Sequence, residues 1–238
     1  MKFVHIADLH LDRPFTSLAS RESLSDIRRL EQRKVLKKVI QYIKDNSVKY
    51  LFISGDLYEE EYVKKSTINY INDLFKEIPD TKIFISPGNH DPYIKNSYYT
   101  DFDFSPNVYI FKGEFECVEA DEANIFGMGF TSFYCKSIDL SKIKIPENGK
   151  PNILVMHASL TGGSNENQEY NPILESKLEE LGMDYIALGH IHKPYYNEKP
   201  NQRIVYPGSL VSLGFDELGE HGMIVRRFIK WKFKFKIC

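Results

Sequence analysis

The sequence has no apolar run that approaches the roughly 18 residues of a membrane span. Its first ten residues, MKFVHIADLH, also lack the charged and then apolar pattern of a signal peptide. We therefore expect a cytoplasmic protein that has no membrane partner. Cysteine is scarce, because Cys117, Cys135 and Cys238 are odd in number, widely separated and form no CxxC pair. This usage argues against a disulfide framework and against structural zinc held by thiolates.

A charge excess of one sign is missing as well. The 31 basic and 33 acidic residues give a net charge of −2, so any contact with nucleic acid must be local. The 238 residues, of which 42% are hydrophobic, are enough for one domain with a large core. Short runs rich in Ile, Val, Phe and Tyr alternate with stretches of helical periodicity, which is typical of an α/β layered fold. Strands are predicted at residues 2–7, 50–54, 82–86, 108–111, 124–127, 152–156, 185–188, 203–206 and 223–229.

Three helices are predicted between these strands. The first has a basic surface from Arg28 to Lys38, interpreted as a solvated face rather than a DNA track, and an apolar stripe formed by Ile27, Leu30, Leu36, Val39, Ile40 and Ile43. The second ends before Pro79 and buries Ile68, Ile71, Leu74 and Phe75. The third is expected around residues 173–181. The last residues, WKFKFKIC, alternate as an edge strand protected by lysines does.

Polar clusters directly follow the predicted strands and contain five of the seven histidines. The clusters are ADLHLD, ISGDLY, PGNHD, VMHAS and LGHIH. Ligands bind at the carboxyl ends of strands in open α/β sheets, so these clusters should meet at one rim. Two carboxylates, four imidazoles and one amide oxygen are about the donors that two divalent ions need. The candidate metal ligands are Asp8, His10, Asp56, Asn89, His157, His190 and His192.

Other polar residues receive structural interpretations. His5 lies inside the first strand, where we expect it to be hydrogen-bonded within the fold. His221 is interpreted as a turn residue. The acidic run from Glu59 to Glu61 is interpreted as a solvated face, with the alternative that its position just after GD lets it shape the groove, and it is given no role.

The ordered set DxH, GD, GNHD, H and GHxH resembles the calcineurin-like metallophosphoesterases. The longer segments HIADLHLDRPF, ISGDLYEEE, SPGNHDPY, HASLTGG, DYIALGHIHKP and IVYPGSL are similar to the SbcD and YhaO branch of DNA repair exonucleases. The resemblance implies a four-layer α/β/β/α sandwich of two mixed sheets flanked by helices. Residues 1–225 would form the nuclease domain and residues 226–238 a short basic and aromatic C-terminal strand or tail. The DNA-capping region and the segment that docks an SMC-like ATPase would be absent.

The resemblance also implies a role for each candidate ligand. One divalent ion would be held by Asp8, His10 and His192, and the other by Asn89, His157 and His190. Asp56 would bridge both ions, and a hydroxide between them would attack phosphorus in line. The ions are expected to be Mn²⁺, although the donors also suit Fe or Zn²⁺.

Four further residues receive roles near the ions. His90, with its ring oriented by Asp91, would stabilise or protonate the leaving oxygen. Arg13 and Lys193 lie close to the ligands in the chain and would contact the substrate phosphate. The expected activity is hydrolysis of phosphodiester bonds in DNA from an end. The alternatives are a phosphodiesterase or phosphatase acting on nucleotides or other small esters, and a non-catalytic scaffold of the same fold. DNA is the expected partner. An SMC-like ATPase partner and a homodimer are left open.

Overall fold

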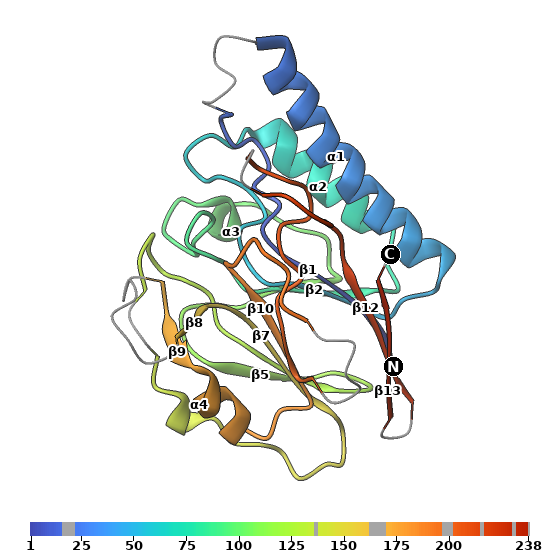
Figure 1. The fold of residues 1–238 in the computed structure, drawn as a ribbon, viewed down its shortest axis with the longest axis vertical. Helices are drawn as coiled ribbons and strands as arrows, with labels where there is room; N and C mark the ends of the chain where they lie inside the picture. The colour runs from blue at the N-terminus through green and yellow to red at the C-terminus, as the bar shows by residue number, and fades with distance from the viewer. Residues whose placement is uncertain are drawn as a thin grey trace.

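The computed structural model describes residues 1–15, 22–135, 138–161, 170–196, 202–214, 217–229 and 232–237. Two mixed sheets face each other and carry helices on their outer sides (Figure 1). The six-stranded sheet has the order β13-β12-β1-β2-β3-β4, and the five-stranded sheet has the order β11-β10-β7-β6-β5. The predicted fold class is therefore confirmed. None of the described helices combines the length and the apolar character that a bilayer crossing needs.

The first sheet contains four parallel strands and two antiparallel ones. The parallel strands are β1 (Lys2–Ile6), β2 (Tyr50–Ile53), β3 (Lys82–Ile85) and β4 (Val108–Ile110). At the other edge β12 (Ile224–Ile229) pairs antiparallel with β1, and β13 (Lys232–Ile237) pairs antiparallel with β12. The division predicted after residue 225 falls inside β12.

Helices α1 (Glu22–Asp45) and α2 (Lys65–Lys76) cover the outer face of the first sheet. The predicted stripe of α2 is buried throughout. The stripe of α1 is shorter than predicted: Leu36 and Ile40 are buried, whereas Ile27 and Leu30 are 49% and 53% exposed. The reason is geometric, because the first turns of α1 extend past the sheet (Figure 1). The short helix α3 (Tyr98–Asp101) lies between β3 and β4 in the chain.

The second sheet places an antiparallel edge strand beside four parallel strands. Its strands are β5 (Glu116–Glu119), β6 (Asn124–Gly127), β7 (Asn152–His157), β10 (Tyr185–Gly189) and β11 (Ile204–Val205). Its outer layer contains α4 (Glu175–Glu180), the 3-10 helix η2 (Leu140–Lys142) and the small sheet of β8 (Ser159–Thr161) and β9 (Pro172–Leu174).

The helix predicted around residues 173–181 is wrong at its start. Ile173 belongs to β9, where it pairs with Leu160 and is buried. Because β9 pairs with β8, its backbone is engaged in a sheet, and only Glu175–Glu180 is left for the helix. Ile173, which fits the helical pattern in the sequence, therefore packs into the core from a strand.

Aromatic side chains fill the space between the two sheets. Phe3 of the first sheet packs on Tyr185 of the second with ring centroids 4.8 Å apart, and on Phe52 at 5.1 Å. His5 is fully buried, with Nδ1 2.9 Å from the Tyr185 hydroxyl and Nε2 3.0 Å from Ser54 Oγ. Burial lowers the pKa of His5 to about 3, so the ring is neutral. The interpretation of His5 as a residue bonded within the fold is confirmed.

The ends of β2 and β10 approach each other closely at Gly189. A Cβ atom at this position would lie far inside van der Waals contact with the Ser54 carbonyl oxygen. We expect Gly189→Ala to lower the free energy of unfolding by at least about 3 kcal/mol, because backbone cannot move aside as a side chain can. The matched control is Gly149→Ala, where φ is +69° and no heavy atom lies within 4 Å. Its cost should be only about 1 kcal/mol. Urea denaturation that gives equal costs for both variants would contradict the close contact.

Candidate metal centre

The candidate ligands occupy the points where strands of both sheets end. Asp8 follows β1, Asp56 follows β2, His157 is the last residue of β7, and His190 follows β10. Three of these residues have a left-handed backbone, with φ of 52° at Asp8, 52° at Asp56 and 101° at His190. His10 shares this conformation with φ of 47°. Such strain costs energy in residues other than glycine and is concentrated at functional sites.

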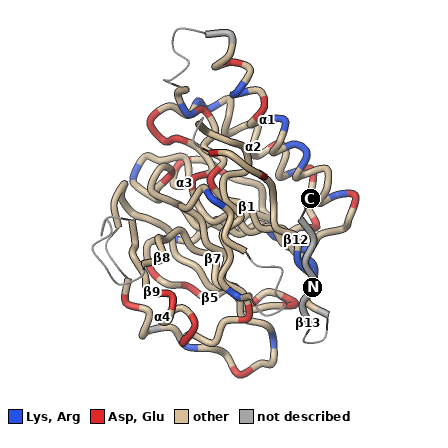
Figure 2. Tube along the Cα trace, viewed as in Figure 1, with Lys and Arg blue, Asp and Glu red and all other residues tan. Residues whose placement is uncertain are grey.

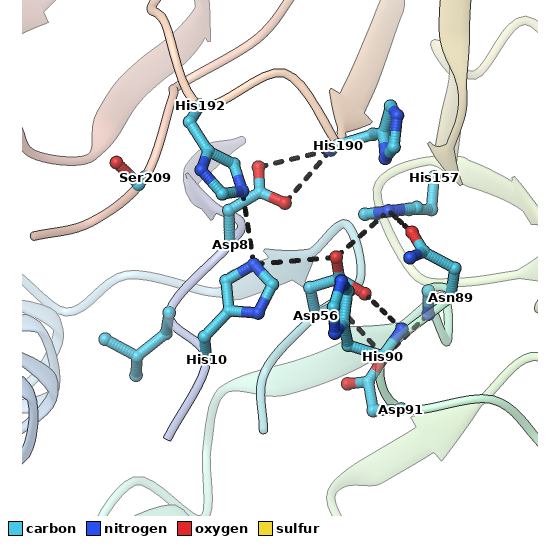
Figure 3. Close-up of polar contacts among 12 residues, drawn as sticks. Asp8, His10, Asp56, Asn89, His90, Asp91, His157, His190, His192 and Ser209 are labelled. Carbon is cyan, nitrogen blue, oxygen red and sulfur yellow. Dashed lines mark hydrogen bonds and ion pairs between the residues drawn. The ribbon is translucent and has the colours of Figure 1, made fainter. Parts of the chain in front are cut away.

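All seven predicted ligands meet in one cluster (Figure 3). Asp56 lies at its centre, with Oδ2 3.6 Å from His10 Nε2 and 3.3 Å from His157 Nε2. Asn89 Oδ1 is 3.0 Å from the same His157 nitrogen. Ligand atoms lie within 4.8 Å of one another in three groups: Asp8, His10 and His192; Asp56, His157 and His190; and His10, Asp56 and His90. The first group is the set that the resemblance assigns to one ion, and the second contains two of the three residues assigned to the other, with Asp56 in place of Asn89. The third includes His90, to which the resemblance gives no ion, so the division into two ions stays a prediction.

Three of the histidines have their Nδ1 atom held by a neighbour. Nδ1 of His10 lies 2.9 Å from Glu59 Oε1, and Nδ1 of His192 lies 2.6 Å from Glu217 Oε1. Nδ1 of His157 lies 2.8 Å from the Ser54 carbonyl oxygen. Such partners fix the ring orientation of metal-binding histidines and leave Nε2 for the ion. Together with the buried carboxylates, these rings fit a pair of divalent cations.

Buried charges in the cluster stabilise one another. Burial alone would raise the pKa of Asp56, but the adjacent His157 lowers it below its ordinary value. Burial disfavours the charged form of His157, yet Asp56 raises the pKa of this ring to about 9. Burial and the charge of His157 lower the pKa of His190 to about 3. A cation would therefore take the place of the His157 proton, since histidine binds metal only when it is deprotonated.

The carboxylate that contacts the His90 ring is that of Glu59, not that of Asp91. Nδ1 of His90 lies 2.7 Å from Glu59 Oε2, while the other Glu59 oxygen contacts His10. Asp91 is fully buried and accepts hydrogen bonds from the backbone N–H groups of Asp56, Leu57 and Gly88 and from the Tyr99 hydroxyl. The expectation that Asp91 orients His90 is therefore wrong. Asp91 instead holds together the loops that carry Asp56 and Asn89.

Sequence reasoning missed two carboxylates of the cluster. The acidic run predicts a solvated face for Glu59, although its place three residues after Asp56 in GDLYE is a signal that it lies near the ligands. The sequence around Glu217 contains no comparable signal, because it lies far from the ligand motifs in the chain. It reaches His192 from the loop after β11, where it also accepts hydrogen bonds from Ser209 Oγ and the Leu213 N–H, both at 2.8 Å.

Arg13 and Lys193 lie beside candidate ligands. The Arg13 backbone N–H donates to the His10 carbonyl at 3.1 Å, and the residue is half-buried. Lys193 directly follows His192 and is exposed. Both positions are compatible with a phosphate bound at the cluster, and the roles of the two side chains stay a prediction.

Glu59 offers a direct test of the contacts around the histidines. Burial alone would raise the pKa of Glu59, but hydrogen bonds to His10 and His90 lower it to about 2, so the group is ionised. We expect Glu59→Gln to reduce metal affinity and turnover by about 10- to 100-fold, as loss of a partner of a ligating histidine does. Isothermal titration with Mn²⁺ and steady-state kinetics would measure both effects. The control is Glu61→Gln, an exposed neighbour that should change neither quantity.

Comparison with known proteins agrees with this arrangement. Residues 1–194 match the family described as calcineurin-like phosphoesterase. The chain is 25% identical over 231 residues to the uncharacterized metallophosphoesterase YhaO of Bacillus subtilis, an alignment that covers 93% of this chain and 56% of that protein. It is 27% identical over 253 residues to the SbcD component of the nuclease SbcCD of Staphylococcus epidermidis, covering 92% of this chain and 64% of that protein.

The chain thus spans 56% and 64% of the length of these two relatives. Among solved structures, the calcineurin-like phosphoesterase YfkN of Bacillus subtilis is 12% identical, with a TM-score of 0.46 and coverage of 100% of this chain and 90% of that one. So remote a likeness adds nothing to the argument from the sequence. Because the match over residues 1–194 covers well over half of the molecule, the chain belongs to the calcineurin-like phosphoesterase family.

Proposed function

We propose that this protein hydrolyses phosphodiester bonds of DNA from an end, with two Mn²⁺ ions held by the seven clustered ligands. The observation that carries the proposal is the buried carboxylate of Asp56, which stands between His10 on one side and His157 on the other. When bound, the two ions would polarise the phosphate and lower the pKa of water. A single carboxylate within reach of both ligand groups is what such a pair of ions requires.

His90 is placed to serve the leaving oxygen. Its backbone N–H donates to Asp56 Oδ1 at 2.9 Å, which ties its position to the central carboxylate. Its side chain is 42% exposed and so remains accessible to a substrate. Burial lowers the pKa of His90, but the hydrogen bond to Glu59 and the charge of Asp56 outweigh this effect and raise it overall. This shift favours the protonated ring, which is the form that a proton donor needs.

Support for DNA as the substrate comes from the relatives and from local charge. One relative is named as part of a nuclease. Lysines and arginines line α1 (Figure 2), but Arg33 is paired with Asp12, and Arg29 with Asp26. Contact with the DNA backbone is therefore assigned to the rim, where Arg13 and Lys193 lie, rather than to the helix. By the same likeness we propose a cytoplasmic location, while an SMC-like ATPase is left open as a partner.

The test compares end-labelled linear DNA with a mononucleotide ester in Mn²⁺. The proposal predicts stepwise release of nucleotides from one end of the DNA and loss of all activity in EDTA. Hydrolysis of thymidine 5′-(p-nitrophenyl phosphate) that leaves DNA intact would instead support the alternative, a phosphodiesterase or phosphatase for small esters. A protein that binds no Mn²⁺ and hydrolyses neither substrate would be a scaffold that keeps the fold for other contacts.

A further inference from the structure

Aromatic rings continue from the cluster to the surface on the side of His190. The ring of Tyr170 lies over that of His190, with centroids 5.0 Å apart and an interplanar angle of 32°. The ring of Tyr134 follows Tyr170 at 6.1 Å and 33°. Tyr134 is 62% exposed, and Phe133 beside it is 39% exposed. A row of tilted rings thus leads from a candidate ligand to solvent.

The backbone holds this row of rings in place. Cys135 and Tyr170 form an isolated parallel bridge, and the Asn171 N–H donates to the Cys135 carbonyl at 2.6 Å. Asn171 is fully buried, and its side-chain amide donates to the carbonyl of His157 at 3.2 Å. The aromatic segments are therefore tied to the end of β7, which carries a candidate ligand. Rings fixed in this way lose little freedom when another ring packs on them.

We propose that Tyr134 and Tyr170 form a stacking platform for the base of the nucleotide whose phosphate lies at the cluster. The inference rests on the proposed function and deepens it, because it makes the enzyme selective for esters that carry a nucleobase. An exposed tyrosine face suits any base, since every base has a π-face, and stacking on aromatic side chains is how single strands are held without sequence preference. The platform adjoins the candidate ligand His190. A nucleotide whose phosphate lies at the cluster would therefore bring its base next to the platform.

The experiment measures kcat/KM for two esters with the same leaving group. Thymidine 5′-(p-nitrophenyl phosphate) carries a base, and methyl p-nitrophenyl phosphate does not. We expect Tyr134→Leu to lower kcat/KM for the thymidine ester on the order of tenfold, mostly through KM, and to leave the methyl ester unchanged. Tyr134→Trp should restore kcat/KM for the thymidine ester to the value of the wild type. The control is Tyr42→Leu, since Tyr42 lies on α1 under the Lys2 ammonium at the opposite end of β1 and should affect neither ester.

A binding measurement gives a second readout that does not depend on turnover. Single-stranded oligonucleotides with phosphorothioate linkages would carry 2-aminopurine at the 3′ end or at the 5′ end. Its fluorescence falls when it stacks, so the wild type should quench one of the two probes and Tyr134→Leu should not. Tyr170→Leu should act in the same direction.

The outcomes separate this inference from the proposed function. A Tyr134→Leu variant that hydrolyses both esters as the wild type does, with unchanged quenching, overturns the platform and leaves the hydrolase intact. Intact DNA together with base-dependent hydrolysis of the thymidine ester supports the platform and overturns DNA as the substrate. A wild type that hydrolyses neither the two esters nor DNA overturns both proposals. One that degrades DNA alone keeps the hydrolase, and the quenching measurement then decides the platform.

Discussion

Replacing Asp56 with asparagine is expected to remove both bound metal and hydrolysis, and to have the largest effect of any single substitution in the cluster. Asp56 is 1% exposed, and one of its oxygens faces His10 and His157 together. Asparagine keeps the size of the side chain but loses its charge. Its N–H₂ group would replace either the oxygen that faces both His10 and His157 or the oxygen that accepts from the His90 N–H. Because both groups depend on this carboxylate, neither ion should be retained.

The loss of kcat/KM on a phosphodiester should exceed the roughly 100-fold upper range that is typical of an outer partner of a ligating histidine. Metal analysis after desalting should show that Mn²⁺ content falls along with activity. The matched control is Asp80→Asn, which alters an exposed carboxylate in the turn between α2 and β3. Its activity and metal content should equal those of the wild type. Full occupancy of both ions in Asp56→Asn would contradict a central role for this carboxylate.

His90→Ala is expected to behave differently, retaining metal while losing turnover. The His90 ring is held by Glu59 through Nδ1 and remains partly open to solvent, as a proton donor to a substrate should be. Loss of a positioned acid typically costs about 10² to 10⁴ in rate. Steady-state kinetics on DNA and on a nitrophenyl ester would measure the effect, and metal analysis of the same preparation would measure occupancy.

The two kinds of ester make the His90 test sharper. A nitrophenolate leaves without needing a proton, whereas the alkoxide of a DNA sugar does need one. The turnover of the nitrophenyl ester should therefore fall less than the turnover of DNA. Since His90 can also be grouped geometrically with His10 and Asp56 as a metal-binding set, metal content is the decisive quantity. A variant that loses Mn²⁺ to the same degree as Asp56→Asn would make His90 a ligand rather than the acid.

The sequence predicts the position of a ligand wherever that ligand directly follows a predicted strand. Asp8, Asp56, His157 and His190 each come at or just after the end of a predicted strand, and parallel strands deliver their ends to one rim. The clustering of the ligands could therefore be predicted before any coordinates were known. The two-sheet architecture itself came from the family resemblance, because local periodicity does not say which strands share a sheet.

The contacts around the histidines could not be predicted in the same way. Asp91 adjoins His90 in the chain, but its side chain points to the backbone of a neighbouring loop, and Glu59 comes from another strand exit to take the place beside the ring. Glu217 reaches His192 from 25 residues further along the chain. Ile27 and Leu30 fit the periodicity of α1 but belong to its first turns and are 49% and 53% exposed. In each case the three-dimensional path of the chain, not the local pattern, decides the partner.

The pairing of β1 with β12 joins the two ends of the chain in one sheet. β1 supplies the strand that leads to Asp8, yet one of its two neighbours is β12, with Lys2 opposite Arg227. During synthesis the earliest strand must wait with an open edge for more than two hundred residues, a separation at which contacts form slowly. Because β12 follows the last candidate ligand, His192, in the chain, β1 gains this neighbour only after every candidate ligand has been made.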